Sequence, residues 1–145
     1  MIIDYELFKE GAWTRVGQEV DIANDFKIDP DNLNGELCAL PAKMISYGQL
    51  HSQLKSEVSR KEEYVKFIYA QLALNIRGET EKVTEGKIKE QVTINQQYQQ
   101  ALAELNHSSK NSLLAESWWR SINKKADLIQ SLVYRESSEI KRGAY

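Results

Sequence analysis

Three basic residues at equal intervals are the first candidates for chemistry in this chain. Lys55, Lys66 and Arg77 are spaced by eleven residues, or three helical turns, so on an α-helix they share one stripe. Such a row of cations can neutralise the phosphates of a flexible polyanion without forming a pocket. The residues near this stripe have small side chains that leave room for a nucleic-acid backbone: Ser59, Ala70 and Ala73.

An alternative interpretation treats these cations as an ordinary solvated helix face. Acidic residues precede basic ones by four positions in the pairs Glu57–Lys61 and Glu62–Lys66. Side chains at that spacing can form ion pairs across one helical turn. The sequence leaves both interpretations open.

A second basic cluster directly follows a pair of tryptophans. Arg120, Lys124 and Lys125 come after Trp118 and Trp119. Basic residues beside aromatic ones suit phosphate neutralisation combined with base stacking. A heptad count along this helix places Trp119 in the row of residues that packs against other helices, which favours a position in the core. Trp118 points about 100° away from it, which leaves a core flank, a subunit contact and base stacking as alternatives.

Residues that could carry enzyme chemistry are scattered. His51 and His107 lie far apart and have no Cys, His or Asp partner at metal-ligand spacing. The seven glycines form no phosphate-binding loop, and the carboxylates show no paired arrangement suited to acid–base catalysis. We therefore predict that the protein is not an enzyme and holds no metal and no cofactor.

Two long helices must position the basic residues. Apolar residues recur every three or four positions from Pro41 to about Arg77, where Gly78 predicts the helix end. Gly48 is a weak point inside this helix, or else permits a close helix crossing. Thr84 is expected to cap a short segment that buries Ile88 and Val92, and Asn95 to cap a helix reaching about Glu136.

The last helix carries a seam of heptad-spaced residues, many of them small. Long helices with such seams are more easily stabilised in an oligomer. We expect the seam to form the contacts between copies in a ring or bundle, through Tyr98, Leu105, Trp119 and Ile122. The predicted fold is mainly α: a helical hairpin of two long helices with short connecting helices and an irregular N-terminal arm, in an oligomer.

Charge divides the chain into an acidic arm, residues 1–42, and a helical oligomerisation and nucleic-acid-binding domain, residues 43–145. The arm has nine acidic residues and three basic ones, and the rest has 16 basic and 12 acidic ones. Short strands or a hairpin around Gly11 or Gly17 are an option within the arm. A short helix, Pro30–Ala39, is expected to bury Leu33, Leu37 and Cys38.

The cysteine count and hydropathy predict the compartment. A lone cysteine cannot form an internal disulfide and suits a reducing cytoplasm, which is the host's if the protein is viral. No secretory signal is visible, and the most apolar stretch, 65–76, is too short to span a bilayer. We expect a cytoplasmic protein that does not contact a membrane.

The middle of the chain resembles the UvsY-like recombination mediators of tailed phages. That family has a helix ending in Ala-Leu-Lys-x-Arg, a polar turn, a segment opened by Ser or Thr, and then Val and Tyr six residues apart. Here Ala73-Leu74-Asn75-Ile76-Arg77 precedes the turn 78–83, Thr84 follows, and Val92 and Tyr98 have the same spacing. Met44, Tyr47 and Leu50 also resemble the start of the family's first helix. The resemblance covers roughly residues 43–135.

The resemblance implies a function in DNA recombination, repair and replication. Such mediators bind single-stranded DNA as ring-like oligomers, contact the single-strand-binding protein and the recombinase, and help the recombinase load. Arg77 carries over to the family's DNA-binding motif, whereas Asn75 stands where the family has Lys. A different interpretation remains: a non-enzymatic helical protein-interaction module such as an adaptor, a chaperone or a phage structural component.

Overall fold

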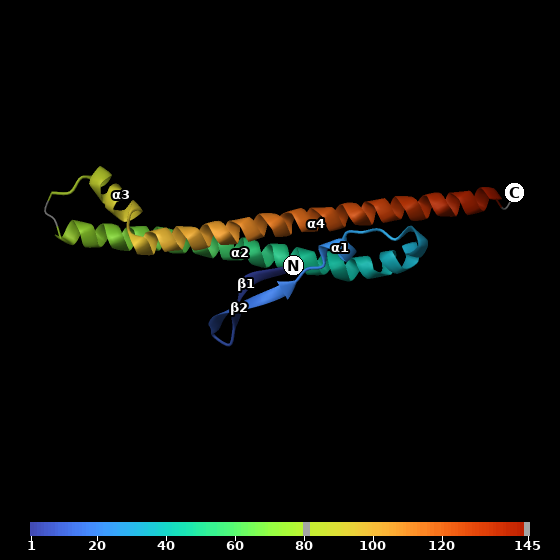
Figure 1. Cartoon of the computed structure of the whole chain (residues 1–145), viewed down its shortest axis with the longest axis horizontal. Coiled ribbons are helices and arrows are strands. Elements are labelled where there is room, and N and C mark those ends of the chain that lie inside the picture. Colours follow the sequence, from blue (N-terminus) through green and yellow to red (C-terminus); the bar gives the residue numbers. More distant parts are fainter. Residues whose placement is uncertain (80–81, 144–145) are drawn as a thin grey trace. The chain divides into compact units, whose positions relative to one another are not determined.

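The chain begins with a β-hairpin, which corrects the predicted irregular arm. The structure is a computed structural model that describes residues 1–79 and 82–143. β1 (Ile2–Lys9) pairs antiparallel with β2 (Ala12–Glu19) (Figure 1). In this register Phe8 lies opposite Trp13. Between the strands, Glu10 and Gly11 have φ angles of 50° and 79°. Two successive positive φ angles match the twist of a two-residue hairpin, so the turn forms at Gly11 and not at Gly17.

Two short turns of helix connect the hairpin to the first long helix. α1 (Ile22–Asp25) is capped by Asp21, and η1 (Pro30–Asn32) is capped by Asp29. Asn24 donates to the Asp21 carboxylate from its side chain, at 2.7 Å, and from its backbone, at 3.2 Å. These hydrogen bonds favour the ionised form and lower the pKa of Asp21.

α2 (Leu33–Glu79) is one continuous helix and contains Pro41. The predicted helix Pro30–Ala39 and the predicted start at Pro41 are therefore wrong. Inside the helix, Pro41 removes one backbone hydrogen bond and its ring crowds the carbonyl of Leu37, so it is a local weak point of α2. The buried face begins with the half-buried Glu36 and continues through Leu40, which is 3% exposed. Leu37 and Cys38 lie off that face and are exposed, contrary to the predicted burial.

The predicted caps of the remaining helices are confirmed. The Thr84 hydroxyl accepts from the Lys87 N–H at the start of α3 (Glu85–Thr93). The Asn95 side chain accepts from the backbone of Gln97 and Tyr98 at the start of α4 (Gln96–Gly143). α4 continues seven residues beyond the predicted end. The middle of the predicted turn, 80–81, and the end of the predicted domain, 144–145, lie outside the described residues.

The described chain forms two compact units. The hairpin unit comprises residues 1–53 and 113–143, and the turn unit comprises residues 54–79 and 82–112. α2 and α4 contribute to both, so the predicted boundary after residue 42 falls inside α2. The core of the hairpin unit includes Ile3, Val20, Leu40, Leu50, Ala115, Ile122 and Ile129. The core of the turn unit includes Leu54, Ile68, Ala73, Ile88, Val92 and Ala101.

Candidate nucleic-acid interface

The predicted basic stripe lies on the exposed part of α2 in the turn unit. Lys55, Lys66 and Arg77 are all exposed. The Lys66 Nζ lies 3.3 Å from a carboxylate oxygen of Glu63, not of Glu62 as predicted. The Arg77 guanidinium contacts Glu85 of α3 at 2.6 Å. Within the described residues Lys55 has no ion pair. Of the three residues of the stripe, it is the one whose positive charge no described carboxylate neutralises.

α3 covers part of the stripe. Ala73 is only 4% exposed because Ile88 and Val92 pack over it. The expectation that Ala73 leaves room for a nucleic-acid backbone is therefore wrong. Figure 1 shows α3 folded back beside the long helices. α3 brings the exposed Lys87 and Lys89 into the turn unit, and periodicity along α2 could not reveal these cations.

The second predicted cluster forms a shallow basic hollow on α4 in the hairpin unit. Arg120 and Lys124 are exposed and line a cavity of about 260 Å³. The hydroxyl-bearing Ser117 and Ser121 lie on the same surface. The Arg120 guanidinium contacts Glu116 at 2.6 Å, whereas Lys124 has no ion pair within the described part of the chain. Glu116 also lines the hollow, which thus combines two cations, one of them paired with this carboxylate, and two hydroxyl groups that can contact a phosphate.

Lys125, the third predicted member of this cluster, does not lie on the surface. It is 3% exposed, and its Nζ lies 2.6 Å from Glu36 Oε2 and donates to the Asp25 carbonyl at 2.7 Å. Glu36 Oε2 is buried and takes no well-aligned hydrogen bond, so charge attraction dominates the pair. Neighbouring residues of a helix point about 100° apart. Lys124 therefore faces solvent while Lys125 faces the core.

Asp25 joins α1 to its neighbours in the hairpin unit. Its carboxylate accepts from the Tyr47 hydroxyl at 2.6 Å and pairs with Lys43 at 3.4 Å, while its carbonyl accepts from Lys125. Burial of the phenol, followed by this hydrogen bond, raises the pKa of Tyr47. The arrangement anchors α1 to α2 and α4.

Trp118 takes the core position that was one of its alternatives, whereas the predicted core packing of Trp119 is wrong. Trp118 is 7% exposed and meets the edge of the Tyr47 ring, whereas Trp119 is 38% exposed. Trp119 stacks on His51 with ring centroids 5.3 Å apart. A Cβ at Gly48 would lie 3.3 Å from the Trp119 Nε1, so Gly48 permits the close approach that its position suggested. Trp118, by contrast, packs in the core.

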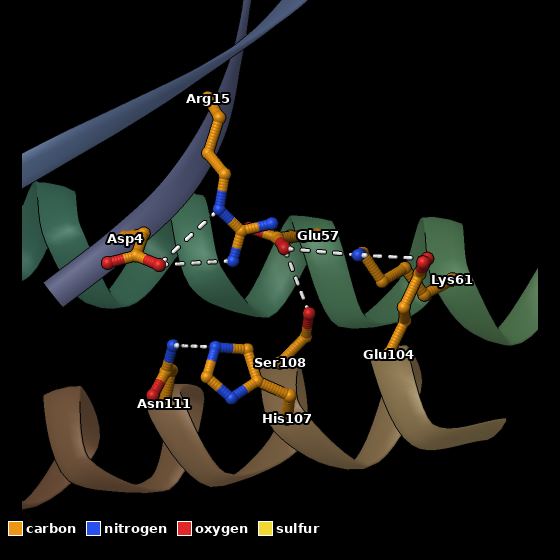
Figure 2. Close-up of polar contacts among 8 residues, drawn as sticks. All are labelled: Asp4, Arg15, Glu57, Lys61, Glu104, His107, Ser108 and Asn111. Atoms are coloured by element: carbon orange, nitrogen blue, oxygen red, sulfur yellow. Dashed lines mark hydrogen bonds and ion pairs between the residues drawn. The ribbon is translucent and has the colours of Figure 1, made fainter. Parts of the chain in front are cut away.

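A buried carboxylate links α2 and α4 within the turn unit (Figure 2). Glu57 is 3% exposed and accepts from the Ser108 hydroxyl at 2.8 Å. Lys61 Nζ lies 3.7 Å from Glu57 and 3.7 Å from Glu104. The predicted Glu57–Lys61 pair is confirmed. The network holds two helices together through polar groups that the heptad pattern did not reveal.

Figure 2 also draws two further polar pairs. In the hairpin, Arg15 donates to Asp4 at 3.4 and 3.2 Å. On α4, His107 contacts Asn111 at 3.4 Å, one helical turn away. Neither pair forms part of a basic surface, and within the described residues no cluster of His, Cys, Asp and Glu could hold a metal ion.

The residues predicted to join copies mostly pack within one chain. Ile122 is 0% exposed, and Tyr98 and Leu105 are half-buried. The Tyr98 ring meets Tyr69 with centroids 6.1 Å apart. Trp119 alone among the four predicted residues is exposed, and its indole stacks on His51. Contact between copies through these residues stays a prediction, and of the four only Trp119 is exposed in the single chain.

The comparisons with known proteins add no further constraint. No family model, curated protein or solved structure matches the chain. Within the described residues, every helix is too short or too polar to cross a bilayer.

Proposed function

We propose that this chain is a non-enzymatic recombination mediator. It binds single-stranded DNA as an oligomer and assists loading of a recombinase onto DNA covered by single-strand-binding protein. The observation that carries the proposal is that each basic surface keeps an exposed lysine with no ion-pair partner among the described residues: Lys55 in the stripe and Lys124 in the hollow. The sequence resemblance supplies the recombinase and the single-strand-binding protein as partners.

The remaining basic residues support the same function despite their acidic neighbours. Lys66 and Arg77 form ion pairs whose side chains are all more than half exposed. Exposed pairs of this kind contribute only about 0–1 kcal/mol, so a phosphate can replace Glu63 or Glu85 at little cost. Arg120 can exchange Glu116 for a phosphate in the same way, beside the serine hydroxyls of the hollow.

A salt titration of DNA binding tests the proposal. Fluorescence anisotropy with a labelled oligothymidine should show binding that weakens as the salt concentration rises. For single strands the logarithmic slope is about −0.7 per phosphate neutralised. The double variant K55A/K124A should therefore lower the slope by about 1.4 in magnitude. The matched control K9A/K27A removes the same charge from exposed lysines of the arm and should leave the slope unchanged.

Two results would contradict DNA binding. One is an anisotropy that does not change at low salt, and the other is an affinity that K55A/K124A leaves intact. The second candidate, a helical protein-interaction module, would then be preferred. It is favoured by the large apolar side chains that α2 leaves exposed, such as Phe67 and Leu74.

The mediator step needs its own assay. Recombinase from the same source should assemble slowly on single-stranded DNA that is already covered by single-strand-binding protein. Adding this protein should shorten the lag, and K55A/K124A should restore it. A lag that the wild-type protein leaves unchanged would reduce the function to DNA binding alone.

A further inference from the structure

α2 presents an apolar face to solvent in the turn unit. Tyr64, Phe67 and Leu74 are 47%, 59% and 66% exposed. Their spacing of three and seven residues matches the core positions of a heptad repeat and places them on one side of the helix. The other core positions of that repeat are Arg60, Gln71 and Gly78. Three large apolar side chains in one row exceed the scattered exposure that a surface helix normally shows.

The other helices of the turn unit leave this face uncovered. Lys61 points toward α4, where it contacts Glu104, and Ala73 is buried beneath α3. At 100° per residue, Phe67 and Leu74 lie about 100° or more from both of these directions. A partner can therefore reach Phe67 and Leu74 without displacing α3 or α4, and Arg77 would exchange its contact with Glu85 of α3 for one with the partner.

The charges beside the face indicate what covers it. Glu63 and Arg77 lie on the same flank of the repeat, and Ala70 lies midway between them. When two copies of such a helix pack antiparallel about Ala70, Glu63 of each copy lies opposite Arg77 of the other. Opposite charges then meet twice, and the small alanines meet at the centre. A parallel arrangement does not bring these two residues together.

We propose that a second copy of this chain packs antiparallel on this face through Tyr64, Phe67 and Leu74, with Glu63 and Arg77 pairing across the contact. The inference specifies a surface for the self-association in the proposed function. The contact is isologous and closes at two copies, so a ring needs a further surface. Three large side chains from each copy make a small interface, and we expect a dissociation constant on the order of micromolar.

The molar mass in the absence of DNA tests this dimer. Sedimentation over a range of concentrations should show a monomer–dimer equilibrium for the wild type. F67E/L74E should be monomeric at every concentration. The control variant I94E introduces one carboxylate outside the face, at a position that is 80% exposed. It should dimerise like the wild type. Circular dichroism checks that both variants keep their helices.

Charge reversal tests the antiparallel pairing. E63R should weaken the dimer at least tenfold, because arginine then faces Arg77, and E63R/R77E should restore it. A short maleimide cross-linker, used with Cys38 changed to alanine, provides a second measurement. A mixture of E63C chains and R77C chains should cross-link, whereas neither variant should cross-link to itself.

Three outcomes would overturn the inference. They are a wild type that stays monomeric at high concentration, a dimer that survives F67E/L74E, and E63C chains that cross-link to themselves. DNA binding is measured separately on the same proteins. A monomeric F67E/L74E that still binds oligothymidine supports the interface and shows that DNA binding does not depend on it. A dimer that binds no DNA refutes only the proposed function.

Discussion

Changing Lys125 to methionine should destabilise the protein strongly, whereas the same change at the adjacent Lys124 should not. Lys125 is 3% exposed, and its Nζ contacts Glu36 at 2.6 Å and the Asp25 carbonyl at 2.7 Å. Methionine keeps most of the length and the apolar stem of the side chain, so the loss is confined to the charge and the hydrogen bond. Lys124 is exposed and makes neither contact.

The magnitude follows from burial. Removing one member of a buried ion pair costs about 3–5 kcal/mol, because the other charge remains buried and unpaired. The Glu36 side chain is 17% exposed and can recover some hydration, so we expect about 3 kcal/mol for K125M. A chain of this size loses about 2–4 °C in Tm for each kcal/mol, which gives a decrease of about 6–12 °C. K124M should stay within about 0.5 kcal/mol of the wild type.

Urea unfolding followed by circular dichroism measures both variants. The double variant E36M/K125M should recover most of the stability, because it replaces the buried pair with apolar side chains of similar size. Conversely, K124M should weaken binding to oligothymidine. A K125M protein as stable as the wild type, or a K124M protein equally destabilised, would refute the opposite orientations of these two lysines.

Two further predictions concern the aromatic side chains of the hairpin unit. In urea unfolding, W118A should cost about 3–5 kcal/mol and W119A about 1–2 kcal/mol, since Trp118 is buried and Trp119 is 38% exposed. Equal losses would contradict this assignment. Because its pKa is raised, the Tyr47 hydroxyl stays protonated in the folded state at a pH where the phenol of the unfolded chain, with a pKa near 10, ionises. The stability advantage of the wild type over Y47F should therefore be complete below pH 10 and decrease as the pH rises above 10. Urea unfolding at several pH values measures it, and a constant difference would show that Tyr47 titrates normally.

Much of the local structure could be predicted because its causes lie close together in the sequence. The Thr84 and Asn95 caps each depend on a side chain that reaches a backbone N–H two or three residues ahead. The burial of Ile88 and Val92 follows from their spacing of four on a short amphipathic helix. The hairpin was only one option for the arm, since Gly11 and Gly17 were both candidate turns.

The functional surface was predicted less well, because exposure depends on neighbouring elements. Ala73 lies on the same side of α2 as Lys55, and only the return of α3 shows that it is covered. The buried carboxylate of Glu57 could not be predicted, since its partner Ser108 is 51 residues away. The predicted oligomer seam stays a prediction, because its periodicity indicates burial but does not say whether the same chain or a second copy supplies the contact.

The amino-acid sequence by itself determined the helical composition, the helix caps and the positions of the basic residues along the chain. These properties follow from intrinsic propensity, from hydrogen bonds within one turn and from helical periodicity. The tertiary structure alone decided which cations face solvent. Lys124 and Lys125 are chemically identical neighbours, and they differ because only Lys125 points toward Glu36 and the Asp25 carbonyl.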